Sequence, residues 1–172
     1  RLDEARTLAQ AGLVATPRYA GPYLPLCTLF LRFEGRGEVT DYRRELDIGS
    51  AVARITFTKG GVHFTREYIA SYPANVIAIR LTADQPGAIS LYANMGTRIT
   101  PEGRLLMQGR ATDGGVEYDC MVEARAEGGV IETIGDTLHI SRADSATIYV
   151  ASDTSFRGAF PEAECALTLN NA

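Results

Sequence analysis

The chain has 172 residues, of which 45% are hydrophobic and 22% charged, an ordinary balance for one globular domain. Its net charge of -4 and pI near 5.2 argue against a nucleic-acid surface, because neutralising phosphates requires clustered lysine and arginine. The sequence contains no run of apolar residues long enough for a membrane helix, and no signal segment opens it.

The chain begins with Arg rather than Met, so we expect it to lack its natural start, and its localisation stays unassigned. Residues 1–16 predict a short helix, because alanine and leucine recur there at helical spacing and Pro17 supplies a stop signal. A helix this short is marginal in isolation and is stable only when it packs on something larger.

Between residues 20 and 156 the apolar residues follow the two-residue period of β-strands. The clearest case is 116–126, in which Cys120 belongs to the apolar side and Asp119 and Met121 belong to the opposite side. We expect the apolar side to face the core and the opposite side to face water.

Glycine-containing turns separate the expected strands. Lys59-Gly60-Gly61 is typical of a tight hairpin between strands at 51–58 and 62–71. Further strands are expected at 28–33, 75–83, 88–95, 104–108, 130–134, 137–141 and 145–152. About ten short strands with no helices between them predict an all-β fold, and their single wet faces favour a sandwich of two antiparallel sheets.

Residues 161–172 return to a helical composition, with Pro161 at the first helical position. No internal repeat, low-complexity tract or interdomain linker interrupts the pattern. We therefore predict a single β-sandwich domain over residues 1–172, with short terminal helices at 1–16 and 161–172 and the sandwich at 20–156.

Few side chains are placed to carry chemistry. Cys27, Cys120 and Cys165 show no metal or redox spacing and are predicted to be buried apolar side chains. His63 and His139 each lie inside an expected strand without a second ligand at a recognisable spacing, which favours roles as cross-strand partners. The sequence therefore predicts no catalytic residue, no metal site and no cofactor.

Acidic residues gather most densely around the basic pair Arg43 and Arg44, where Asp41, Glu45 and Asp47 flank it. We interpret this segment as a surface ion-pair network. A glycosidase needs two carboxyl groups facing one bond, about 5 to 10 Å apart. The other acidic residues lie mostly in turns or on the polar sides of strands, so we expect solubility and turn roles for them.

Sugar binding without catalysis requires aromatic platforms and planar polar groups. Tyrosines crowd the first half of the chain, although tryptophan is absent. Tyr23, Tyr42 and Arg43 are therefore the candidate substrate-binding residues. The alternative is that the tyrosines pack at strand ends with their hydroxyl groups at the surface.

One long stretch has a family resemblance. Residues 23–73, YLPLCTLFLRFEGRGEVTDYRRELDIGSAVARITFTKGGVHFTREYIASYP, resemble the N-terminal β-sandwich of glycoside hydrolase family 95, which comprises α-L-fucosidases and related α-L-galactosidases. The similarity continues through NVIAIRLTADQPGAIS and GGVIETIGDTLHISRADSATIYVASDTSF. Where the family typically reads Y-Q-P-L-G-D-L, this chain has Leu24, Cys27 and Thr28 at the variant positions, which weakens any substrate contact from that loop.

The resemblance implies a supersandwich fold and a non-catalytic role. In that family the catalytic acid and base lie on an (α/α)6 helical barrel, which would follow Ala172, and 161–172 would begin the linker. We therefore expect a scaffold or accessory domain of an α-L-fucosidase-like enzyme, with the barrel as its partner. The alternative is a standalone module that binds a fucose- or galactose-containing glycan or another protein. A freestanding chain would expose a sheet face and edge, so we would then expect a homo-oligomer.

Overall fold

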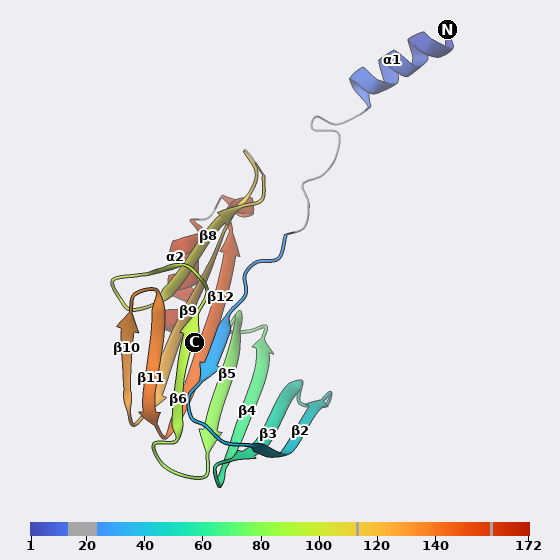
Figure 1. The fold of residues 1–172 in the computed structure, drawn as a ribbon. Coiled ribbons are helices and arrows are strands. Elements are labelled where there is room, and N and C mark those ends of the chain that lie inside the picture. The colour runs from blue at the N-terminus through green and yellow to red at the C-terminus, as the bar shows by residue number, and fades with distance from the viewer. Residues whose placement is uncertain (14–23, 113, 159) are drawn as a thin grey trace.

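The computed structural model describes residues 1–13, 24–112, 114–158 and 160–172. Two antiparallel sheets pack face to face, which confirms the predicted all-β sandwich (Figure 1). The smaller sheet has the order β1-β6-β11-β10, formed by Phe30–Phe33, Ile89–Asn94, Thr137–Ala143 and Val130–Ile134. The larger sheet has the order β2-β3-β4-β5-β12-β9-β8-β7, formed by Val39–Asp47, Val52–Lys59, Val62–Ser71, Val76–Ala83, Ser145–Thr154, Glu117–Glu127, Leu105–Arg110 and Arg98–Ile99.

Helices lie at both ends of the described chain. Helix α1 spans Leu2–Gly12, a 3-10 turn spans Ser155–Arg157, and α2 spans Pro161–Asn171. No residue of α1 is buried, so it adds nothing to the core, and the part of the predicted 1–16 helix beyond residue 13 lies outside the described residues. Neither described helix is long and apolar enough to cross a membrane.

Every strand expected from the sequence is present, and two strands were missed, β2 and β7. Strand β2 is an edge strand in which almost every residue is exposed, so it carries no alternation of apolar and polar residues. Its pairing with β3 shifts register between Thr40 and Arg43, and Asp41 there has a φ of 54°. Such a bulge breaks the flat edge that would otherwise invite strand addition.

The main core lies between the two sheets. From the larger sheet it takes residues of β5, β12, β9 and β8, and from the smaller sheet residues of β6 and β11. Cys120 is buried in this core, and its sulfur lies 3.6 Å from the sulfur of the half-buried Cys27. Both are free thiols, as is the buried Cys165, which agrees with their predicted role as small apolar side chains.

Helix α2 builds a second core on the other face of the larger sheet. Cys165 and Leu169 are buried there against Leu106 of β8 and Met121 of β9. The prediction that this side of β9 faces water is therefore wrong, because Met121 is 2% exposed and Asp119 is 5% exposed. Strand β9 is buried on both of its faces, by the sandwich core and by α2.

The helix–sheet contact predicts a large effect at one leucine of α2 and a small effect at another. Leu169→Ala removes a fully buried side chain and leaves a cavity, so we expect the free energy of unfolding to fall by about 2 to 5 kcal/mol. Leu167→Ala is the matched control, because Leu167 is 56% exposed and its loss should cost about 0.5 kcal/mol or less. Urea unfolding followed by circular dichroism measures both. Equal losses would contradict the packing of α2 on the sheet.

Candidate functional site

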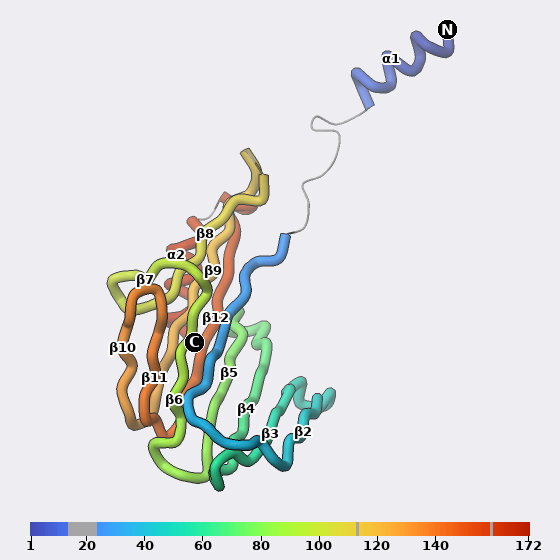
Figure 2. The backbone as a smooth tube through the Cα atoms, viewed as in Figure 1, coloured from blue at the N-terminus to red at the C-terminus, as the bar shows by residue number. Residues whose placement is uncertain are grey.

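The main candidate site is a pocket where the chain leaves the smaller sheet and crosses to the larger one, a path that can be followed in Figure 2. The pocket has a volume of 220 Å³. Strands β1 to β4 and the start of β6 contribute its walls. The side chains that define its chemistry are Phe33, Tyr42, Phe57, Lys59, Phe64 and Arg66.

The pocket exists because the inner face of the larger sheet extends beyond the smaller sheet. Phe57 and Phe64 are directly paired across β3 and β4, and their rings stack with centroids 5.2 Å apart. Arg66 follows Phe64 by two residues and so lies on the same face of β4. Tyr42, on the edge strand β2, stays 59% exposed at the mouth.

Arg66 is the most unusual side chain of the pocket. Its guanidinium carbon lies 3.5 Å from the ring centroid of Phe33 and 4.7 Å from that of Phe57. Burial lowers the pKa of Arg66, while the hydroxyl groups of Tyr68 and Tyr42 counter that effect. Among the described residues, no carboxylate forms a salt bridge with Arg66. The aromatic rings are therefore its main stabilising partners.

The crossing segment supplies the polar rim. Lys59 donates from Nζ to the carbonyl oxygen of Gly35 at 2.7 Å and to that of Glu34 at 3.4 Å, which fixes this segment over the pocket. The Glu34 carboxylate is engaged elsewhere, 3.1 Å from Nε2 of His139. It also raises the pKa of Tyr92 through a hydrogen bond. The charged groups free to face a ligand are therefore cationic.

The structure separates the two described residues of the three that were predicted to bind substrate. Tyr42 lines the pocket, whereas Arg43 is exposed and pairs with Glu45 at 2.6 Å. Tyr23 lies outside the described residues. Sequence reasoning missed Arg66, although a signal was present: it stands between Phe64 and Tyr68 in the strand pattern, at a position expected to be apolar.

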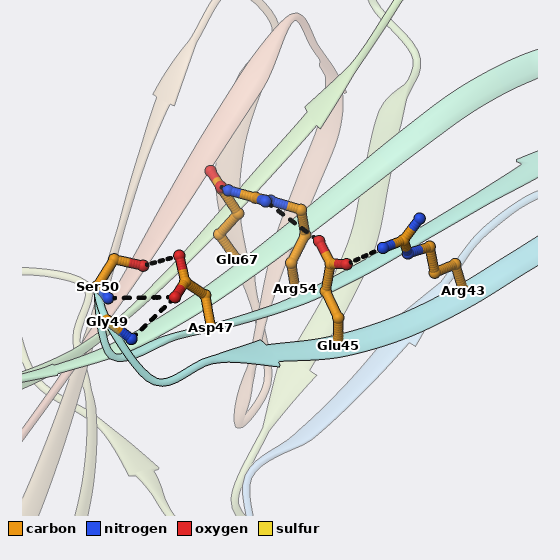
Figure 3. A network of polar contacts seen from close by, with 7 residues as sticks. All are labelled: Arg43, Glu45, Asp47, Gly49, Ser50, Arg54 and Glu67. Atoms are coloured by element: carbon orange, nitrogen blue, oxygen red, sulfur yellow. Dashed lines mark hydrogen bonds and ion pairs between the residues drawn. The ribbon is translucent and has the colours of Figure 1, made fainter.

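The predicted ion-pair network is present in part, on the outer face of the larger sheet, where Arg43 and Glu45 join Arg54 and Glu67 (Figure 3). Arg54 pairs with Glu45 at 3.2 Å and with Glu67 at 2.8 Å, so the network crosses β2, β3 and β4. Asp47 caps the β2–β3 turn by accepting hydrogen bonds from the Ser50 hydroxyl and two backbone amides, and these bonds lower its pKa. Asp41, Arg44 and Asp47 of the predicted segment join no ion pair among those found in the described chain, so the expectation holds only for Arg43 and Glu45.

Both histidines have the predicted cross-strand role. His139 of β11 is paired with Tyr92 of β6, and the two rings stack with centroids 4.4 Å apart. His63 of β4 is paired with Thr58 of β3, whose hydroxyl oxygen lies 3.4 Å from its Nδ1. These contacts stabilise the pairing of neighbouring strands.

Three acidic residues line one cleft at the start of α2: Glu117, Asp119 and Glu162. The amide nitrogen of Gln108 donates to Asp119 at 3.1 Å and to Glu162 at 3.2 Å, and Arg98 pairs with Glu162 at 3.1 Å. Burial raises the pKa of Asp119, and the negative charges of Glu162 and Glu117 add to that effect, against the Gln108 hydrogen bond. The Gln108 amide binds both Asp119 and Glu162, and the Arg98 guanidinium also pairs with Glu162. We therefore interpret the cluster as a clamp that holds α2 to β8 and β9.

Comparison with known proteins identifies the family. The model described as "Glycosyl hydrolase family 65, N-terminal domain" matches residues 1–159. The chain belongs to this family. The sequence motifs had indicated family 95, so the family number differs from the expectation, while the N-terminal domain of a glycoside hydrolase is confirmed.

Curated relatives are α-fucosidases. "Alpha-L-fucosidase 2" of Arabidopsis thaliana is 29% identical over 149 residues, covering 69% of this chain and 18% of that protein. "Probable alpha-fucosidase A" of Aspergillus oryzae is 23% identical over 150 residues, covering 80% and 21%. The chain thus spans about a fifth of the length of these relatives.

A solved structure has a similar fold. The "Putative kojibiose phosphorylase from human microbiome" superposes with a TM-score of 0.53 at 10% sequence identity. The match covers 81% of this chain and 24% of that one. This likeness supports the sandwich fold alone.

The clamp predicts a pH-dependent effect at Asp119. A raised pKa in the folded state means that ionising this carboxyl group opposes folding, a cost that is present above the folded pKa and disappears below the ordinary value of 3.8. Asp119→Asn should therefore raise the free energy of unfolding at pH 7, and the gain should vanish as the pH falls through that window. Chemical unfolding across the pH range measures it, with exposed Glu38→Gln as the control. A gain that grows toward low pH would contradict the assignment.

Proposed function

We propose that this chain is the non-catalytic N-terminal domain of an α-L-fucosidase-like glycoside hydrolase of the family 95 kind, and that it docks a helical catalytic domain. Two findings together carry the proposal. The chain matches a model of an N-terminal domain, and it spans only 18% of the length of an α-L-fucosidase relative. In this proposal the remaining four-fifths of the enzyme hold the catalytic acid and base.

The outer face of the larger sheet supports a docking role. Beside α2, the apolar side chains of Val52, Ile69, Ala78 and Tyr149 line a shallow hollow of 300 Å³. Ile69 is 39% exposed there, and Leu167 on α2 is 56% exposed. A helical domain that follows α2 would cover this apolar surface, which otherwise stays in contact with water.

The ion-pair network borders the same hollow. Glu67 lines it and pairs with Arg54, while Arg80 lines it from β5. Polar side chains around an apolar centre are the arrangement typical of protein–protein interfaces. We propose the catalytic barrel as the occupant, and a second copy of this chain, as a homo-oligomer, is the competing occupant.

A binding measurement between two separately expressed proteins tests the docking proposal. The coding sequence downstream of residue 172 should encode a helical domain, and that domain expressed separately should bind the 172-residue chain. Ile69→Asp places a charge in the apolar hollow and should weaken the complex by at least about tenfold. Ile134→Asp is the control, because Ile134 is 54% exposed on the smaller sheet. Calorimetry of the two proteins measures both variants.

Several results would contradict the proposal. Turnover of an aryl α-L-fucoside by the 172-residue chain alone would show that it is catalytic. Equal affinities of the two variants would place the interface elsewhere. Light scattering that finds a dimer of this chain, broken by Ile69→Asp, would assign the face to self-association instead.

A further inference from the structure

We propose that the pocket around Arg66 binds a single sugar ring that carries a carboxylate, such as a uronic acid. The choice of a sugar rests on the proposed function, whereas the choice of a carboxylate rests on the pocket itself. The site uses the inner face of the larger sheet, opposite to the face proposed for docking.

The charge of the pocket is unbalanced. Arg66 is half-buried on a strand face that otherwise carries core residues, and no carboxylate among the described side chains forms a salt bridge with it. Lys59 adds a second cation at the rim, and the one lining acid, Glu34, has its carboxylate beside His139. Burial of a cation without a counterion is costly, and an anionic ligand would offset that cost.

The geometry of Arg66 suits a carboxylate. A guanidinium group offers a planar fork of donors that matches the two oxygens of a carboxylate. The contacts of Arg66 with the rings of Phe33 and Phe57 hold this fork in place, so little side-chain freedom is lost when a ligand binds. A cation that is already positioned and lacks an acid partner differs from the exposed arginines of the outer network, which are paired with glutamates.

The size and lining of the cavity suit a single sugar ring. Its volume of 220 Å³ lies below the range of about 300 to 1,000 Å³ for drug-sized ligands, so it fits one ring rather than a chain of rings. Phe64 and Tyr42 provide aromatic surface for the apolar face of such a ring. Lys59 and Ser90 at the rim provide polar groups for its hydroxyls.

Titration calorimetry of the 172-residue chain with sodium glucuronate tests the proposal. We expect saturable binding at millimolar ligand that weakens with added salt, because the interaction is between opposite charges. Methyl glucuronate, the neutral ester, and fucose should bind at least about tenfold more weakly, since they lack the carboxylate. Arg66→Gln should reduce the affinity for glucuronate by a similar factor.

Arg43→Gln is the matched control, because the same substitution on the outer face leaves the pocket unchanged. Arg66→Lys keeps the positive charge but loses the planar pair of guanidinium donors, so it should bind glucuronate with intermediate affinity. This variant provides a second test if Arg66→Gln fails to fold. The proposal would be overturned if glucuronate does not bind, if the acid and its ester bind equally, or if folded Arg66→Gln binds glucuronate as tightly as the unchanged chain. It would also be overturned if benzoate, a carboxylate without a sugar ring, binds and glucuronate does not. None of these results bears on the docking of a catalytic domain.

Discussion

The burial of strand β9 on both faces is the constraint on which the rest of the structure depends. Val122 and Cys120 face the sandwich core, while Met121 and Asp119 face α2, and all four are at most 5% exposed. A strand covered on both sides fixes its neighbours β8 and β12 in register, and it fixes the helix as well. Helix α2 therefore belongs to the fold of the domain, and any segment that follows it would start from a defined place beside the larger sheet.

The unequal size of the two sheets explains the remaining surface. A four-stranded sheet covers β5, β12, β9 and β8 of an eight-stranded one, and β4 in part, so the inner face of β2 and β3 extends past its partner (Figure 1). Arg66 lies at the margin of the covered part, held between Phe33 of the smaller sheet and Phe57 of the larger one. The outer face of the same strands carries the network centred on Arg54. One half of the larger sheet thus builds the core, and the other half presents two surfaces of different chemistry.

The positions of most strands could be predicted from the sequence, but the burial of their outer faces could not. Period-two alternation located the ten expected strands, and Lys59-Gly60-Gly61 located the hairpin, because local patterns fix local structure. The burial of Asp119 could not be predicted, since it depends on a helix more than 40 residues further along the chain. Met121, an apolar residue on the side expected to be wet, was the available signal. Strand β2 was missed because an edge strand with two exposed faces needs no alternation.

Hydrogen exchange tests most directly whether α2 completes the fold of this domain. In the intact chain the amides of β9 and β12 should exchange most slowly, and those of the edge strand β2 much faster. Truncation after residue 160 removes α2, so the account predicts a large loss of protection in β8, β9 and β12 and little change in the smaller sheet. Unchanged protection of β9 in the truncated chain would contradict the central claim.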